Sequence, residues 1–172
     1  MKGYFTAEIG KLKNERSALL TGGITAAAVG AVIWVLFSGC ECVWQVCIVP
    51  PAFPPRIVLL ILCGSWNFIF GVLFAHVLVS CEISRIIRRK CLLDISLAML
   101  FSFIWYPLLF AAGVPILALA AIVGCMVFLV FALICRGIGD LVFTVLSVSA
   151  ILRCAYYIFA VITFTLVNYM IF

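Results

Sequence analysis

Long apolar runs, separated by short polar or proline-rich breaks, make up almost the whole of this chain. Five of them are long enough for helices that cross a bilayer, which takes about 20 apolar residues. They lack the short alternating segments typical of an outer-membrane β-barrel. The pattern therefore predicts an all-α integral membrane protein, a bundle of five transmembrane helices. After a polar N-terminal segment at 1–16, the spans of the domain 17–172 are expected at approximately 17–37, 57–81, 92–112, 116–135 and 141–171.

The charges support this topology. The run Arg85–Lys90 (RIIRRK) places four cations in six residues, which must lie at a membrane surface. With five spans, the N-terminal cations and Arg136 fall on the same side as this run, and Arg56 falls on the other. The positive-inside tendency makes the richer side the cytoplasmic-type face.

Composition excludes an ordinary soluble globule, because 68% of the residues are hydrophobic, 10% are charged and the mean hydropathy is +1.40. The net charge of +5 is explained by orientation and by contact with anionic lipid headgroups, so no nucleic-acid partner is expected.

Small residues in the first span form one face. Gly22, Ala26 and Gly30 recur at every fourth position, which lets a neighbouring helix approach closely. We expect this face to pack within the bundle, with a homodimer interface as the alternative.

The second span carries an amide in its apolar sequence. Asn67 shares a helical stripe with Gly64, Gly71 and Phe74, and this stripe is expected inside the bundle because an amide facing lipid would be unsatisfied. His76 lies on the opposite side of the helix. A single histidine without partners makes a poor metal site, so we interpret it as an interhelical hydrogen-bonding residue.

In the third span, Ile95, Ala98, Ser102 and Trp105 share a stripe that is expected to face the interior. Pro107 removes a backbone hydrogen bond and is expected to kink the last turns.

Two features flank this span. Asp94 is expected to pair with Lys90 at the surface, four residues before it. Gly113 and Pro115 are expected to form a tight turn into the fourth span.

The fifth span has a partly polar stripe of Arg153, Tyr157, Phe164 and Asn168, which lie within about a quarter-turn of one another. This stripe is expected to face the bundle interior. For Arg153 two interpretations stay open: its side chain reaches back to the basic face, or it holds an anionic group of a ligand.

Catalytic motifs are missing from the sequence. It contains no HExxH, GxSxG, CxxC or Walker pattern, so nothing predicts an enzyme, a metal site or an obligatory cofactor, although turnover is left open. Cys40, Cys42 and Cys47 form a cluster whose oxidation state the sequence does not decide, and their spacing does not favour a redox pair.

What remains is an interior of aromatic surface beside a few hydrogen-bonding groups, from Asn67, Ser102, Trp105, Tyr157 and Asn168. Such a lining suits a flat, mostly apolar ligand. The alternative is an ordinary packed core with interhelical hydrogen bonds.

Several features follow one another in a recognisable order: a tryptophan and a proline-rich first loop, two glycines in the second span, a tryptophan-proline pair in the third and an Asn-Tyr near the end of the fifth. The residues are Trp44, Pro50-Pro-Ala-Phe-Pro-Pro55, Gly64, Gly71, Trp105-Tyr-Pro107 and Leu166-Val-Asn-Tyr169.

This order resembles the TspO/MBR family, which includes the translocator protein, or peripheral-type benzodiazepine receptor. The resemblance implies a pocket inside the five-helix bundle that accepts porphyrins (haem among them), sterols or synthetic aromatic ligands, with Trp44 and the proline loop as its lid. It also implies lining positions at Leu59, Leu62, Trp105, Leu117, Ala120, Phe164 and Val167.

By the same resemblance, the protein would reside in the cell membrane of a bacterium or the mitochondrial outer membrane of a eukaryote, with a homodimer left open. We therefore expect a TspO-like receptor or carrier for a tetrapyrrole or sterol, whose partners are membrane lipid and this hydrophobic small molecule. The alternatives are a small structural or assembly subunit of a membrane complex and a small transporter or channel.

Overall fold

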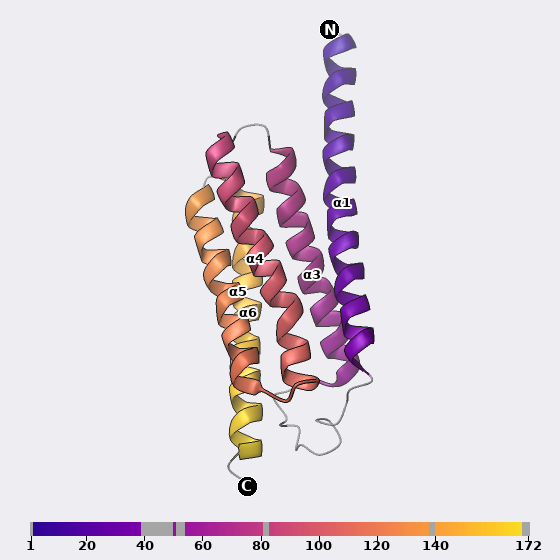
Figure 1. The fold of residues 1–172 in the computed structure, drawn as a ribbon. Coiled ribbons are helices and arrows are strands. Elements are labelled where there is room, and N and C mark those ends of the chain that lie inside the picture. The colour runs from indigo at the N-terminus through magenta and orange to yellow at the C-terminus, as the bar shows by residue number, and fades with distance from the viewer. Residues whose placement is uncertain (1, 39–49, 51–53, 81–82, 138–139, 170–172) are drawn as a thin grey trace.

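Each of the five apolar runs folds into one long helix in the computed structural model (Figure 1). The structure describes the backbone of residues 2–38, 50, 54–80, 83–137 and 140–169, and the side chains of these residues except 2–14, 38, 56 and 169. The helices are α1 (Lys2–Ser38), α3 (Arg56–Val79), α4 (Arg85–Phe110), α5 (Pro115–Arg136) and α6 (Leu141–Tyr169).

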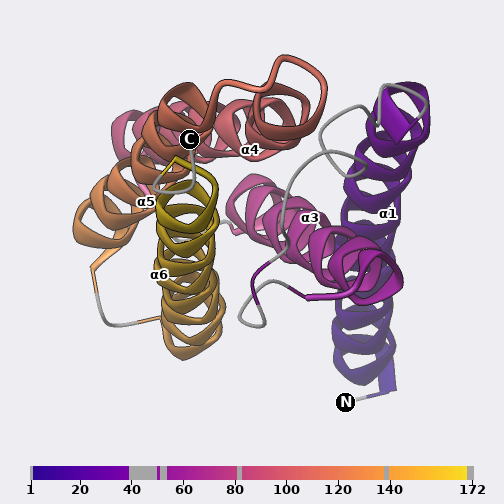
Figure 2. The same ribbon diagram turned by 90° about the horizontal axis from the view of Figure 1, so that it is seen from below.

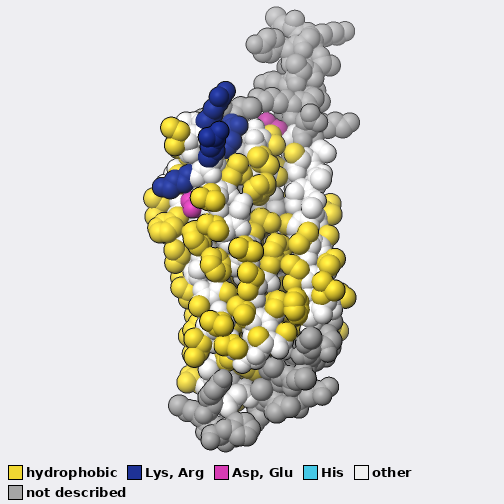
Figure 3. Space-filling view, viewed as in Figure 1, with side chains coloured by type: hydrophobic (Ala, Val, Ile, Leu, Met, Phe, Trp, Pro, Cys, Tyr) yellow, Lys and Arg dark blue, Asp and Glu magenta, His cyan; other side chains and the backbone are white. Residues whose placement is uncertain are grey.

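All five helices contain a stretch long and apolar enough to cross a membrane. Large hydrophobic side chains cover the described surface along the length of the bundle, and Lys and Arg side chains gather at its upper end (Figure 3). The prediction of an all-α, five-helix integral membrane protein is confirmed.

Two helices are longer than the apolar pattern predicts. Helix α1 begins at Lys2, because the polar N-terminal segment continues the first span as a helix. Helix α4 begins at Arg85 instead of residue 92, since Ser84 caps it: the Ser84 hydroxyl accepts a hydrogen bond from the Ile87 N–H at 3.4 Å. The basic run is therefore the first part of α4.

The turn between α4 and α5 forms as expected. Gly113 has a positive φ of 65°, a conformation that glycine adopts without the steric cost of a Cβ. The Val114 N–H donates to the Leu108 carbonyl at 3.0 Å, and Pro115 occupies the first turn of α5, where its missing N–H costs nothing.

The helices are arranged as a ring in the order α1, α3, α6, α5, α4 (Figure 2). The most extensive packing joins α4 to α5 and α1 to α3, and α3 also touches α4 across the ring. The ring closes between α4 and α1, where the helices make their least extensive contact.

An aromatic cluster fills the centre of this ring. The ring of Tyr157 lies 5.0 Å from that of Trp66 and 4.9 Å from that of Trp105, and all three residues are buried. The stripe predicted for the third span is also buried, so its interior placement is confirmed: Ile95, Ala98, Ser102 and Trp105.

Candidate functional site

The seam between α1 and α3 is packed backbone against backbone. A Cβ added at Gly71 would lie 2.1 Å from the carbonyl oxygen of Gly22 and 2.8 Å from the Cβ of Ala26. One added at Gly30 would lie 1.9 Å from the amide nitrogen of Asn67. The predicted small-residue face of α1 therefore packs inside the bundle, and α3 is the helix that covers it.

Asn67 of α3 contacts both α1 and α4. Its amide packs on Gly30 of α1, and its carbonyl oxygen accepts a hydrogen bond from the Ser102 hydroxyl of α4 at 3.1 Å. Asn67 and Ser102 are both 5% exposed. Two of the polar residues that the sequence placed in the interior thus contact each other, and the Ser102 hydroxyl also lies 2.9 Å from the Met99 carbonyl oxygen, which is an alternative acceptor for its proton.

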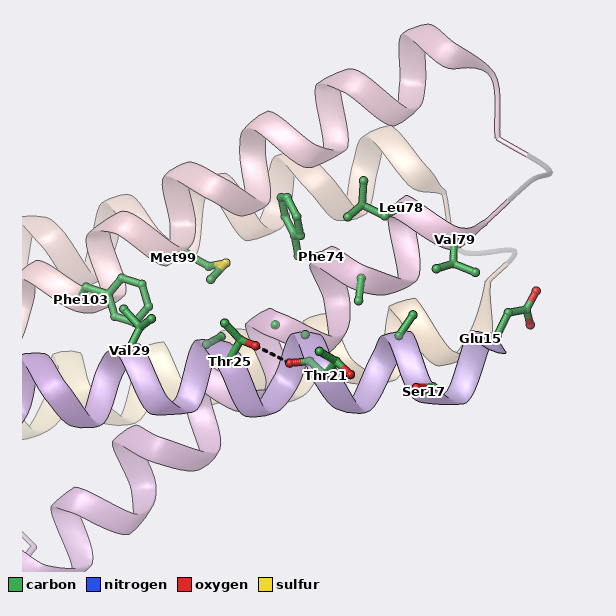
Figure 4. A pocket seen from close by; sticks show the side chains of 15 residues that line it. Glu15, Ser17, Thr21, Thr25, Val29, Phe74, Leu78, Val79, Met99 and Phe103 are labelled. Atoms are coloured by element: carbon green, nitrogen blue, oxygen red, sulfur yellow. Dashed lines mark hydrogen bonds between the residues drawn. The ribbon is translucent and has the colours of Figure 1, made fainter. Parts of the chain in front are cut away.

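Helices α1 and α4 leave space between them, whereas α1 and α3 are closely packed. A cavity of about 900 Å³ lies between α1, α3 and α4 (Figure 4). Its walls are mostly apolar, and its few polar side chains come from α1. It is lined by Glu15, Ser17, Ala18, Thr21, Gly22, Thr25, Ala26, Val29, Gly71, Phe74, Ala75, Leu78, Val79, Met99 and Phe103.

A second cavity of about 430 Å³ continues the same seam toward the other end of the bundle, where Ile33 and Phe37 of α1 face Pro107 and Leu108 of α4. The side chain of Phe103 borders both cavities. It also borders a space of about 20 Å³ beside Asn67, Ser102 and Trp105. Phe103 therefore divides an elongated apolar groove into two parts.

The aromatic cluster itself leaves little room. Trp66, Tyr157 and Trp105 pack on one another. Of the three cavities described above, the one of about 20 Å³ is the one that Trp105 lines. Trp105 and Tyr157, which the sequence placed around a ligand, thus pack on each other and on Trp66, and the large space lies between α1, α3 and α4 instead.

The remaining predicted site residues are distributed over several environments. Leu59 and Phe164 are buried, and Leu62, Val167 and Asn168 are half-buried; the Asn168 amide donates to the carbonyl of Phe164 in its own helix at 2.9 Å.

Leu117, which is 51% exposed, and Ala120 lie on the outer face of α5, because the helix turns Ala118, Ala121 and Ile122 inward instead. Trp44 and the cysteines Cys40, Cys42 and Cys47 lie outside the described residues.

Sequence reasoning missed the α1 wall of the large cavity. Thr21 and Thr25 line it, and the Thr25 hydroxyl donates to the Thr21 carbonyl at 2.8 Å, so its proton is used within α1. Their spacing of four residues in an apolar span was a usable signal. For the opposite wall, which includes Met99 and Phe103, the sequence contains no indication of a cavity, because these residues resemble any other apolar position of a membrane span.

Arg153 joins α6 to α3. Its guanidinium donates to the Leu62 carbonyl at 3.1 Å and to the Ser65 hydroxyl at 2.6 Å. Partners within the protein therefore stabilise this charge inside the span.

His76 and Asp140 hold the basic end of the bundle together. The His76 imidazole lies 2.7 Å from an Asp140 carboxylate oxygen, which also accepts from the Arg136 guanidinium. The Phe143 N–H at the start of α6 donates to the other oxygen at 3.1 Å. Burial alone would raise the pKa of Asp140, but these hydrogen bonds outweigh it and lower the pKa to about 2. The interpretation of His76 as an interhelical hydrogen-bonding residue is confirmed.

The expectation for Asp94 is wrong about its place at the surface, although the charge of Lys90 does act on its carboxyl. Asp94 is 6% exposed, and the structure shows no ion pair between it and Lys90, both of which are described residues. The reason is its helical phase, because Asp94 lies on the same inward face of α4 as Cys91, Ile95 and Ala98.

Within the described part of the chain, no three His, Cys, Asp or Glu side chains lie close enough to hold a metal ion. Comparison with protein-family models, with curated proteins and with solved structures finds no match. The groove between α1 and α4 is therefore the feature of this molecule that points to a function.

Proposed function

We propose that this chain is a TspO-like membrane receptor or carrier that binds a flat hydrophobic molecule, such as a tetrapyrrole or a sterol, in the groove between α1 and α4. The observation that carries the proposal is the cavity of about 900 Å³. Binding sites for small molecules have volumes of about 300–1,000 Å³ and mostly apolar walls with few polar groups.

The walls of the groove suit such a ligand. Phe74 and Phe103 offer aromatic surface, and Met99 is a flexible side chain that adapts to irregular shapes (Figure 4). Burial of apolar ligand surface contributes about 25 cal/mol per Å² before the costs of binding. Glu15, Ser17 and Thr21 supply polar groups to this cavity. The Ser17 and Thr21 hydroxyls suit a carboxylate or hydroxyl edge of the ligand, whereas the Glu15 carboxylate accepts only from a ligand hydroxyl and repels a carboxylate.

The loose closure of the ring supports uptake from the bilayer. Helix α1 is held tightly by α3 and only loosely by α4, so a molecule dissolved in the membrane reaches the groove without breaking the α1–α3 seam. By family resemblance, we place the protein in the cell membrane of a bacterium or the mitochondrial outer membrane of a eukaryote.

The test is a titration of the detergent-purified protein with protoporphyrin IX, followed by tryptophan quenching and corrected for absorption of light by the ligand. Thr25→Phe fills the groove, since Thr25 lines it. We expect saturable quenching at low micromolar ligand, with apparent affinity at least about tenfold weaker in this variant because the ligand and the new ring compete for one volume.

The matched control is Ile24→Phe, which places the same ring on the preceding residue of α1. Ile24 is 61% exposed and does not line the cavity. This control is expected to bind as the unmodified chain does. Quenching that does not saturate, or that is equal in both variants, contradicts the proposal and favours a structural subunit.

A further inference from the structure

Two arginines from different helices converge on the end of α3. The Arg88 guanidinium of α4 donates to the Ser80 carbonyl at 2.6 Å, and the Arg136 guanidinium of α5 donates to the Ser80 hydroxyl at 3.2 Å. Ser80 is the C-cap residue that directly follows α3. The two guanidinium groups therefore share one neighbour at the meeting point of three helices.

Their hydrogen-bonding capacity is not used up. A guanidinium has five N–H donors, and the Nε atoms of both Arg88 and Arg136 are buried without a hydrogen-bond partner among the described residues. A buried donor left unsatisfied is costly. Because these Nε atoms are closed to solvent, an acceptor from outside the described chain would bind other N–H groups of the half-buried guanidiniums or draw the two side chains outward.

The charge of the site is also unbalanced. Arg136 has a carboxylate partner in Asp140, whereas no described carboxylate forms an ion pair with Arg88. Arg85, Arg89 and Lys90 add exposed positive charge beside it. The missing acceptor is therefore expected to be an anion.

The site lies at the depth of lipid headgroups. The apolar stretches of α3 and α5 end at Val79 and Arg136, and that of α4 begins at Arg85. Lys and Arg side chains gather at this end, above the hydrophobic surface (Figure 3). Basic pockets between transmembrane helices at such a surface bind anionic lipid headgroups.

We propose that Arg88 and Arg136 form a binding site for the phosphate group of an anionic phospholipid, at the end of α3 and between α4 and α5. A planar guanidinium matches two phosphate oxygens at once, which a lysine ammonium does not. The acyl chains would extend along the large apolar side chains that cover the outer surface of the bundle. This inference is independent of the groove between α1 and α4.

The test measures thermal unfolding of the purified chain in a neutral detergent while dioctanoyl phosphatidylglycerol is added. Dioctanoyl phosphatidylcholine is the zwitterionic comparison, and inorganic phosphate is a third arm. We expect a saturable rise of the unfolding temperature with the anionic lipid alone. Arg88→Gln is expected to weaken the apparent affinity about tenfold, because it removes a charge-assisted hydrogen-bonding group.

The matched control is Arg89→Gln, which removes the same charge from the next residue, an exposed one. It is expected to leave the affinity within about twofold. Arg136→Lys keeps the charge beside Asp140 but removes the fork of N–H groups, and this second variant is also expected to weaken binding. Equal losses from Arg88→Gln and Arg89→Gln would show diffuse attraction and overturn the site. An equal response to inorganic phosphate would overturn its assignment to a lipid.

Discussion

Helix α1 has two seams of opposite character. Toward α3, a Cβ at Gly22 or Gly71 would collide with the backbone of the other helix, and one at Gly30 would collide with the Asn67 side chain. Toward α4, the same helix borders cavities of about 900 and 430 Å³ that Phe103 separates. Both seams are apolar, so hydrophobicity does not distinguish them.

The two seams differ because small residues of α1 face small residues of α3 but larger residues of α4. In a membrane, lipid tails are as apolar as leucine, so helices associate through close packing and interhelical hydrogen bonds. Small residues are aligned on both sides of the α1–α3 seam. At the α1–α4 seam, the larger side chains of Phe103 and Met99 line the cavity together with residues of α1. One seam therefore fixes α1, and the other leaves a volume that a ligand can occupy.

The largest effect is expected from closing the space in the tight seam. Gly71→Ala places a Cβ 2.1 Å from the Gly22 carbonyl oxygen, which is backbone and cannot move aside as a side chain does. We expect a loss of about 3 kcal/mol in the free energy of unfolding, measured by denaturation in mixed micelles.

Gly64→Ala on the same helix is the control for this substitution. A Cβ at Gly64 meets nothing within 4 Å, so we expect a change within about 1 kcal/mol. If both substitutions destabilise the protein equally, the close contact of α1 and α3 is not what holds them together.

A smaller effect, of about 1 kcal/mol, is expected from removing the contact between His76 of α3 and Asp140, the residue that precedes α6. Hydrogen bonds hold the folded-state pKa of Asp140 to about 2, below its ordinary value of 3.8. The stabilisation is therefore complete above about pH 4 and is lost as the pH falls toward 2.

Asp140→Asn keeps a residue suited to the start of α6 but removes the charge. Unfolding of both proteins between pH 2 and 6 should show a stability difference that is largest above pH 4 and narrows in acid. A difference that does not change over this range would contradict the assigned pKa. The tight seam offers the contrast, because Gly22, Ala26 and Gly71 carry no titratable group.

Much of the fold was predictable because it follows from local signals. The apolar runs specify the five helices, and the spacing of Gly22, Ala26 and Gly30 indicates the tight seam. Burying an amide or an imidazole without a partner is costly, so the sequence predicted interhelical partners for Asn67 and His76. Both residues have such hydrogen bonds in the structure.

The groove was not predictable in the same way. Its volume depends on the distance between α1 and α4, which are far apart in the sequence. No local sequence pattern predicts this distance. Trp105 was correctly placed inside the bundle, but its contact with Trp66 and Tyr157 fills the space that the sequence suggested for a ligand.

The most direct test of the account is photo-crosslinking of protoporphyrin IX from a benzophenone side chain at position 103, with the adduct detected by intact mass. Leu152, 66% exposed on α6, is the control position. The account predicts an adduct that saturates with ligand at position 103 and a weaker, non-saturating one at position 152. Equal, non-saturating adducts at both positions would show that the groove between α1 and α4 is not a binding site.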